Sequence, residues 1–279
     1  MNFESLHQME LAWMQKLQAL HSPFLDQFMI FMNYLDTNVF YLMLVAAIWY
    51  AYDQQCGKRL FFLLILNSFA VHDLKMVFSE PRPCQLEPTL GLLTARSYGF
   101  PSGAAQAWIS SFLLLACSVR RRWFWIVGSL LVLLVSFSRV YLGLHFPSDI
   151  VGGWIFGSAV FFCFWKCLPW VERLLSKQGR AIKSILSLLF FSGLYLLGLN
   201  RTVEYLVLVG IGGSLGMIWA PALAEPTNVL QRLYRPAIVV AGIVLMKAII
   251  AQPALSLLNG LWLSAALPLS SLFKRDHQV

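Results

Sequence analysis

The sequence predicts an all-α protein, a polytopic membrane helix bundle with about nine spanning helices. Of its 279 residues, 58% are hydrophobic and only 12% are charged, and the mean hydropathy is +0.68. A chain with so much apolar surface cannot bury it in one water-soluble core, so we expect it in a lipid bilayer. Nine apolar stretches follow one another, at about 36–52, 60–78, 104–119, 123–138, 148–168, 184–199, 204–221, 237–252 and 254–272. Several are shorter than the roughly 20 residues that cross hydrocarbon, so we expect the helices to extend into their flanks.

The basic residues give the predicted orientation of these helices. The net charge is +8, and the basic residues gather in alternate loops: Lys58, Arg59, Arg120, Arg121, Arg122, Arg173, Lys177, Arg180, Lys183, Arg232, Arg235, Lys274 and Arg275. The positive-inside rule makes this side cytoplasmic. Because topology alone explains the charge, the sequence predicts membrane lipids and no nucleic acid as partners.

The first 35 residues differ from the rest of the chain. Apolar side chains recur there at nearly helical spacing among charged ones, at Leu6, Met9, Leu11, Trp13, Met14, Leu17 and Leu20. This pattern predicts an amphipathic helix at the membrane interface. The apolar piece 24–32 is too short to span comfortably, and it is either re-entrant or a tilted tenth span. We therefore divide the chain into an interfacial segment 1–35, a core 36–168 and a C-terminal transmembrane extension 169–279.

Three polar clusters interrupt the apolar core. Lys75 is followed after six residues by Arg82-Pro83, Pro101-Ser102-Gly103 precedes an apolar stretch, and Ser138-Arg139 precedes His145 and Asp149. The predicted topology places all three clusters at the non-cytoplasmic ends of helices. Ionisable groups at membrane depth are costly and usually functional, so the clusters predict one shared site.

The residue types in these clusters suit a phosphate group. Arg82 and Arg139 offer planar guanidinium forks, and Lys75 offers a compact ammonium group. Ser102 is a candidate N-cap, so the free N–H groups that follow it would point at a phosphoryl oxygen. Gly103 permits a close approach of the backbone to such a ligand.

His145 and Asp149 add a candidate nucleophile and its partner. A carboxylate that holds one imidazole nitrogen orients the ring and leaves the other nitrogen free to attack phosphorus. Attack would form a phosphohistidine, which water would then hydrolyse. Three cations, an imidazole and a carboxylate suffice for phosphoryl transfer without a metal, so the sequence predicts no metal site and no cofactor. His72 lies one turn deeper than Lys75, and we expect it to have a hydrogen-bonding role instead of a catalytic one.

The patterns Lys-x6-Arg-Pro, Pro-Ser-Gly and Ser-Arg-x5-His-x3-Asp together resemble the signature of the type 2 phosphatidic acid phosphatase (PAP2) superfamily. The resemblance covers roughly residues 36–168 and implies a metal-independent acid-phosphatase-type hydrolase. It implies phosphate binding by Lys75, Arg82 and Arg139, support of that site by Ser102 and Gly103, a nucleophilic His145 and its partner Asp149.

One residue departs from this signature. The family has a histidine where this chain has Ala104, and that histidine is expected to protonate the leaving oxygen and help to activate water. Loss of a general acid typically costs about 10²- to 10⁴-fold in rate, so the resemblance implies a catalytically impaired chain. Because the other signature residues are present, we interpret Ala104 as a deliberate replacement of histidine, with a native pseudoenzyme as the alternative.

The sequence thus predicts an integral membrane phosphatase that acts on a phosphate monoester or diphosphate of a lipid, at the periplasmic or lumenal face. The C-terminal extension resembles the branch of sphingosine phosphate phosphatases and glucose 6-phosphatases. Three alternatives stay open: hydrolysis of a soluble ester such as a sugar phosphate, transfer to an acceptor alcohol, and lipid binding without catalysis. The extension also leaves a homodimer open.

Overall fold

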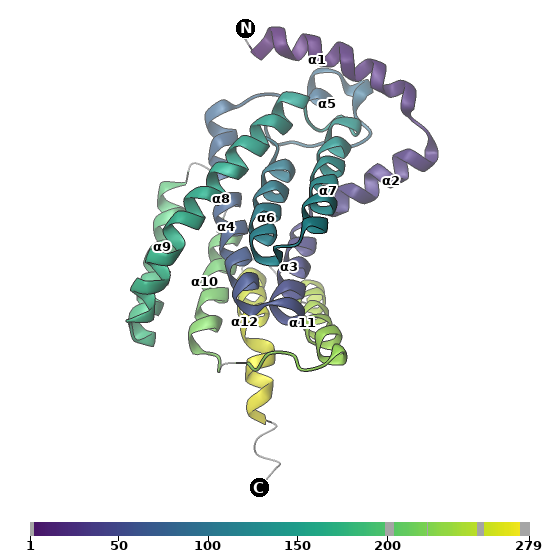
Figure 1. Ribbon diagram of the computed structural model, residues 1–279. Coiled ribbons are helices and arrows are strands. Elements are labelled where there is room, and N and C mark those ends of the chain that lie inside the picture. The colour runs from purple at the N-terminus through teal and green to yellow at the C-terminus, as the bar shows by residue number, and fades with distance from the viewer. Residues whose placement is uncertain (1–2, 199–203, 222, 250–253, 274–279) are drawn as a thin grey trace. The chain divides into compact units, whose positions relative to one another are not determined.

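The computed structural model describes residues 3–198, 204–221, 223–249 and 254–273, which fold into helices and connecting segments without a strand (Figure 1). The nine predicted stretches correspond to α3 (Asn38–Ala47) with the π-helix η2 (Ile48–Tyr52), α4 (Gln54–Phe78), α6 (Gly103–Val119), α7 (Arg122–Tyr141), α8 (Pro147–Ser176), α9 (Arg180–Leu197), α10 (Glu204–Trp219), α11 (Val229–Ile249) and α12 (Ala254–Phe273). The all-α prediction is confirmed. Residues 199 and 250–252 of the predicted stretches, and the predicted cytoplasmic Lys274 and Arg275, lie outside the described residues.

Apolar helices confirm a multi-pass membrane protein. Within the described residues, five helices are long and apolar enough to cross a bilayer. A sixth candidate is the pair formed by α2 (Pro23–Tyr34) and Asn38–Tyr52, which is bent by 65° at a short break. Three shorter apolar helices, 103–119, 204–219 and 255–268, complete the set of candidates. The total of nine spans therefore stays a prediction, as does the re-entrant or spanning nature of the piece 24–32.

The N-terminal segment contains the predicted helix. It forms α1 (Phe3–Leu17) and the 3₁₀ turn η1 (Gln18–Leu20), and Figure 1 shows α1 lying across the end of the bundle near α5 (Pro83–Leu86). One face of α1 packs onto the protein, with Met14 buried in a cluster that includes Phe146 and Ile150. Other apolar side chains of the helix stay partly open, since Met9 and Trp13 are 64% and 50% exposed. The helix is thus amphipathic in its packing, while its place at a membrane interface stays a prediction.

Two compact units make up the chain. The first combines residues 1–40 with 66–163, and the second combines residues 41–65 with 164–279. In the first unit, α6 and α8 approach closely along glycines. A Cβ added at Gly153 would lie 2.7 Å from the carbonyl oxygen of Ser102, and one added at Gly157 would overlap the backbone of Gln106. This close approach brings the first turn of α8 to the start of α6.

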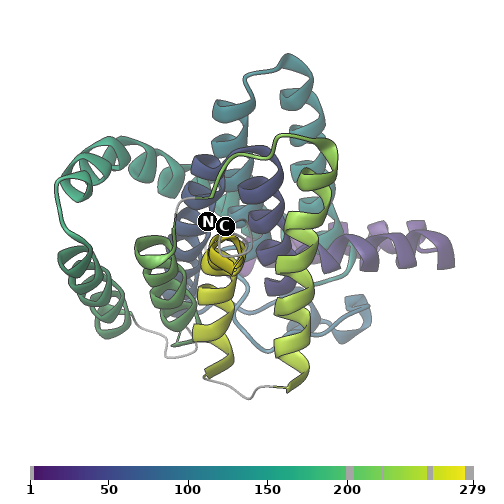
Figure 2. The same ribbon diagram turned by 90° about the horizontal axis from the view of Figure 1, so that it is seen from below.

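The second unit is built around α10, which packs between α9 and α12 (Figure 2). Glycine again permits the close contact, since a Cβ at Gly212 would overlap the backbone of Leu257 and one at Gly260 would overlap that of Val209. The Tyr50 hydroxyl donates a hydrogen bond of 2.6 Å to the carbonyl oxygen of Leu263 in α12. Close backbone contact at glycines thus forms part of the interface between α10 and α12.

Candidate active site

The first compact unit brings the three predicted polar clusters together. Lys75 lies in the last turn of α4, Arg82 immediately before α5, Arg139 in the last turn of α7, His145 in the following loop and Asp149 in the first turn of α8. All five side chains are buried, with relative exposures of 9% or less. Arg120, Arg121 and Arg122 lie at the opposite ends of α6 and α7, about 25 Å from this site along a 17-residue helix.

Arg82 is held by main-chain and side-chain acceptors from two loops. Its Nε donates to the carbonyl oxygen of Ser97 at 2.7 Å, and its Nη2 donates to the Ser97 hydroxyl at 2.9 Å. Its Nη1 donates to the carbonyl oxygen of Leu144 at 2.8 Å and lies 3.1 Å from Nε2 of His145. The backbone of Arg82 is fixed as well, because its N–H donates to the side chain of Gln85. The guanidinium therefore has a defined position beside the predicted nucleophile.

These contacts determine the tautomer of His145. A guanidinium has donors and no acceptor, so Nε2 of His145 must accept the hydrogen bond from Arg82. The proton of the neutral ring is then on Nδ1, which lies 3.1 Å from Oδ2 of Asp149 and donates to it. The same Oδ2 accepts the backbone N–H of Phe146 at 3.0 Å. The imidazole thus presents the unprotonated nitrogen to Arg82 and its N–H to the carboxylate of Asp149.

The surroundings of His145 favour the neutral ring. Burial lowers the pKa of His145 well below its usual 6.5, and the positive charges of Arg82, Lys75 and Arg139 lower it further. A protonated imidazole has no lone pair with which to attack phosphorus. Burial and the neighbouring charges therefore favour the neutral ring at neutral pH, which is the form that the predicted nucleophile requires.

Lys75 is directed into the same region by the loop before α6. Its ammonium group donates to the carbonyl oxygens of Tyr98 at 2.5 Å and Gly99 at 2.9 Å. An ammonium group has three N–H donors, so one remains for a ligand. Gly99 is itself close to Asp149, since a Cβ added there would lie 3.2 Å from Oδ2 of that residue.

Arg139 is bound by residues at the end of α2 and in the bend between α2 and α3. Its Nη2 lies 2.6 Å from Oδ2 of Asp36, and its Nη1 donates to the side-chain oxygen of Asn33. Its Nε is buried and has no hydrogen-bond partner among the described residues. Arg139 therefore combines a carboxylate partner with a buried donor that a phosphoryl oxygen would satisfy.

The start of α6 lies against the first turn of α8. The Ser102 hydroxyl accepts from the N–H of Ala105 at 3.5 Å, and the Ser102 N–H donates to the main-chain oxygen of Asp149 at 3.0 Å. A Cβ at Gly103 would make ordinary contacts with Val71, the nearest at 3.7 Å, so packing against the protein does not require glycine at this position. Ala104 is buried at 2% exposure in this first turn, and its methyl group carries no proton to transfer.

Residues outside these clusters have other roles. Nδ1 of His72 lies 2.6 Å from the carbonyl oxygen of Ser68 and forms a hydrogen bond within α4, in line with the expected hydrogen-bonding role. Among the described residues, His, Cys, Asp and Glu side chains form no group of three or more that could hold a metal ion.

With this geometry established, known proteins provide an independent comparison. Residues 57–173 match the PAP2 superfamily. The chain contains a PAP2 superfamily domain. An undecaprenyl-diphosphatase from Sulfolobus acidocaldarius is 36% identical over 90 residues, which are 32% of this chain and 43% of that relative. A lipid A 4'-phosphatase from Bacteroides thetaiotaomicron is 29% identical over 156 residues, which are 50% of this chain and 68% of that protein.

A solved structure shares the fold of the PAP2 domain. The crystal structure of a transmembrane PAP2-type phosphatidylglycerolphosphate phosphatase from Bacillus subtilis aligns with a TM-score of 0.51 and 22% identity. The alignment covers 61% of this chain and 89% of that protein. This similarity supports the transmembrane helical fold.

Sequence reasoning missed four side chains at or beside the site. Ser97, Asn33 and Asp36 contact the buried arginines, and Glu10 contacts the residue before Asp149. Asn33, Asp36 and Glu10 precede the matched PAP2 segment. Asp36 is an acidic residue at the edge of an apolar stretch, and that position was the signal available in the sequence.

Proposed function

We propose that this chain is an integral membrane phosphatase that removes the terminal phosphate from a lipid monoester or diphosphate through a phosphohistidine intermediate. The single observation that carries the proposal is the orientation of His145. Its Nδ1–H points at Asp149, and its unprotonated Nε2 lies 3.1 Å from Arg82 in a cluster of three cations. Such a cluster stabilises the charge of a phosphoryl group in its transition state.

In the first step, the phosphoryl group enters between Arg82 and His145 and takes over hydrogen bonds from the cations. Nε2 attacks phosphorus, and the bond to the leaving oxygen breaks as the N–P bond forms. The ring becomes positively charged, which Asp149 stabilises through the Nδ1 hydrogen bond. The leaving oxygen departs with the electron pair and requires a proton.

In the second step, water attacks the phosphohistidine. The new P–O bond forms as the N–P bond breaks, which releases inorganic phosphate and restores the neutral ring. Ala104 supplies no proton in the first step and no base in the second. We therefore expect slow turnover by the chain as it stands, about 10²- to 10⁴-fold below that of a variant with histidine at this position.

The proposed substrate class is a lipid phosphate. The relatives are named as phosphatases of undecaprenyl diphosphate, lipid A and phosphatidylglycerophosphate, which share a phosphate on an apolar carrier. The site lies at the ends of apolar helices, where such a headgroup resides. The positive-inside rule assigns this end to the periplasmic or lumenal face. Soluble esters and transfer to an acceptor alcohol use the same intermediate and remain alternatives.

Ala104 favours a second function, which is lipid phosphate binding without catalysis. The three cations are present while the proton-transferring side chain is absent, and such a site would hold a phosphate without turning it over. A native Ala104 would favour this second function, whereas an engineered replacement of histidine would favour the phosphatase. The codon at position 104 in the native gene distinguishes these two cases.

Release of inorganic phosphate tests the proposal. The chain as given and Ala104→His are compared in detergent with a chelator present, on lipid monophosphates, lipid diphosphates and glucose 6-phosphate. We expect Ala104→His to raise turnover by about 10²-fold or more on a lipid substrate. A folded Ala104→His that is inert on every substrate would overturn the phosphatase assignment, and binding of the same lipids would then support the non-catalytic function.

A further inference from the structure

The N-terminal helix α1 contacts the loop that carries the proposed nucleophile. This helix lies outside the matched residues 57–173, and its amphipathic pattern predicts only a place at the membrane interface. In the structure, the His7 ring of α1 stacks on Phe146, which directly follows His145. Glu10 of α1 binds Ser148, which directly precedes Asp149. The contact thus lies on the short segment that connects the proposed nucleophile to its partner.

Glu10 binds the start of α8 with both carboxylate oxygens. Oε1 accepts the backbone N–H of Ser148 at 2.7 Å, and Oε2 accepts the Ser148 hydroxyl at 2.9 Å. Because α8 begins at Pro147, the N–H of Ser148 is one of the first four, which have no acceptor inside the helix. A carboxylate at this end also interacts favourably with the helix dipole. Glu10 therefore caps α8 from a distant part of the chain.

The capped turn is the one that holds His145 in place. Asp149 is the next residue, and its Oδ2 binds both Nδ1 of His145 and the N–H of Phe146. From the same helix as Glu10, the His7 ring stacks on Phe146 with 4.2 Å between centroids and 8° between planes. A shift of this turn would move the carboxylate and the imidazole together.

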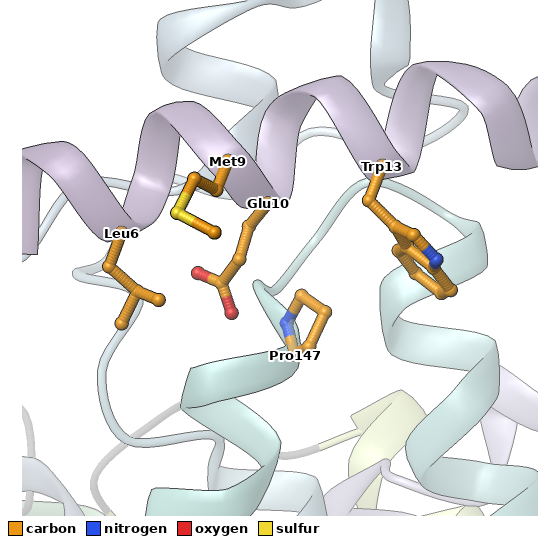
Figure 3. Close-up of a pocket in the computed structure, with 5 residues that line it drawn as sticks. All are labelled: Leu6, Met9, Glu10, Trp13 and Pro147. Carbon is orange, nitrogen blue, oxygen red and sulfur yellow. The ribbon is translucent and has the colours of Figure 1, made fainter.

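Packing alone does not fix the contact between α1 and Pro147. A hollow of about 320 Å³ lies there, lined by Leu6, Met9, Glu10, Trp13 and Pro147, and Figure 3 shows the Glu10 side chain pointing toward Pro147 between its apolar neighbours. Met9 and Trp13 are largely exposed beside it. At this hollow, the two hydrogen bonds of Glu10 connect α1 to the start of α8, in addition to the packing of Met14 against Phe146 and Ile150.

We propose that Glu10 is a positioning residue of the active site, which fixes the first turn of α8 so that Asp149 holds His145 in its attacking orientation. The inference deepens the proposed function, because it names a residue outside the PAP2 domain on which the same site depends. Residues that orient catalytic groups typically contribute about 10- to 100-fold to activity.

Activity provides the first test, in the Ala104→His background. Glu10→Ala should lower kcat about 10- to 100-fold with KM changed less than about threefold. Glu10→Gln should recover part of that loss, because its amide oxygen still accepts one hydrogen bond from Ser148. Ser148→Ala removes the hydroxyl partner, so its effect should not add to that of Glu10→Ala. The matched control is Glu4→Ala, which removes an exposed carboxylate from the same helix.

A second test does not require turnover and uses the chain as given. Diethyl pyrocarbonate modifies neutral imidazole, and the rate at His145 is followed by peptide mass spectrometry across pH. Glu10→Ala should raise this rate several-fold and shift its apparent pKa toward 6.5, because the ring leaves Asp149 and its cationic neighbours. A merely structural role would lower the melting temperature without this selective change at His145.

The two tests separate the failure of this inference from failure of the proposed function. If Ala104→His is inactive on every substrate, the phosphatase assignment fails, and the modification rates still decide the role of Glu10. If Glu10→Ala and Glu4→Ala give the same kcat and the same modification profile, Glu10 has no positioning role. Should Glu10→Ala fail to fold, Glu10→Gln and Ser148→Ala provide the same comparison with smaller perturbations.

Discussion

Both compact units bury an arginine, but among the described residues only the first unit brings other ionisable side chains around its buried arginines. In the second unit, Arg235 is 8% exposed and donates to the carbonyl oxygen of Ala224 at 2.7 Å. In the first unit, Arg82 and Arg139 share their surroundings with Lys75, His145 and Asp149. Both units also use glycine to bring two helices together, α6 with α8 and α10 with α12. A buried arginine and close helix packing therefore occur in both units and do not by themselves indicate a site. The convergence of several charged side chains distinguishes the candidate active site.

The largest expected effect comes from the proposed nucleophile. In the Ala104→His background, His145→Ala should reduce phosphate release by about 10³-fold or more, because no N–P bond can form. His72→Ala is the matched control, since it removes the α4 histidine that binds the Ser68 carbonyl oxygen. Initial rates on the preferred lipid phosphate measure both. Comparable losses in the two variants would contradict the assignment of His145.

The next largest effect is expected from a comparison of Arg82 in the first unit with Arg235 in the second. Arg82→Ala in the same background should lower kcat/KM about 10²- to 10³-fold, because it removes donors aimed at developing negative charge. Arg235→Ala should lower the melting temperature and leave kcat/KM within about threefold, since the lost partner is a main-chain carbonyl group. Steady-state rates and thermal melts in the same detergent separate the outcomes. A large loss of kcat/KM in folded Arg235→Ala would abolish the distinction between the units.

Substitutions at Gly103 and Gly212 should distinguish a glycine needed for ligand approach from a glycine needed for helix packing. Gly103→Ala has room against Val71, so it should fold normally and weaken inhibition by inorganic phosphate about tenfold, by blocking approach to the start of α6. Gly212→Ala overlaps the backbone of Leu257, so it should cost about 1–3 kcal/mol of stability without a change in phosphate inhibition. If Gly103→Ala leaves the inhibition constant unchanged, phosphate does not bind at this helix end.

A smaller effect is expected from the carboxylate that pairs with Arg139. Asp36→Asn should tighten inhibition by inorganic phosphate about three- to tenfold, because the carboxylate competes with phosphate for the guanidinium and repels the anion. Asp26→Asn is the control, since Asp26 is an acidic residue of α2 that accepts a hydrogen bond from the Tyr141 hydroxyl. Weaker inhibition in Asp36→Asn would mean that Asp36 orients Arg139 for phosphate and does not compete with it.

The smallest expected effect is on pH dependence. The folded protein holds the pKa of His145 below its unfolded value of about 6.5, so the unfolded state binds more protons in that range. The stability due to the neutral ring is fully present above about pH 6.5 and decreases as pH falls toward the folded pKa. Thermal melts of the given chain and of His145→Asn should therefore converge as the pH is lowered from 7.5 to 5. A difference that stays constant would show that His145 is not held neutral.

The sequence by itself determined the all-helical membrane class, the positions of the apolar helices and the polar clusters that supply the site. These features depend on local composition and on short spacings, which can be recognised without knowledge of how the helices pack. The residues Lys75, Arg82, Ser102, Arg139, His145 and Asp149 were identifiable because ionisable and capping residues interrupt apolar stretches there.

Only the tertiary structure decided which atoms face each other. The proton of His145 was assigned from the approach of Arg82, and the partners of Arg139 and Ser148 come from positions 106 and 138 residues away. Such contacts depend on how helix ends and loops meet after the helices pack, and no periodicity in the sequence encodes that meeting. The physical reason is that burial of apolar faces selects the helices, whereas satisfaction of buried polar groups depends on neighbours that only packing brings within reach.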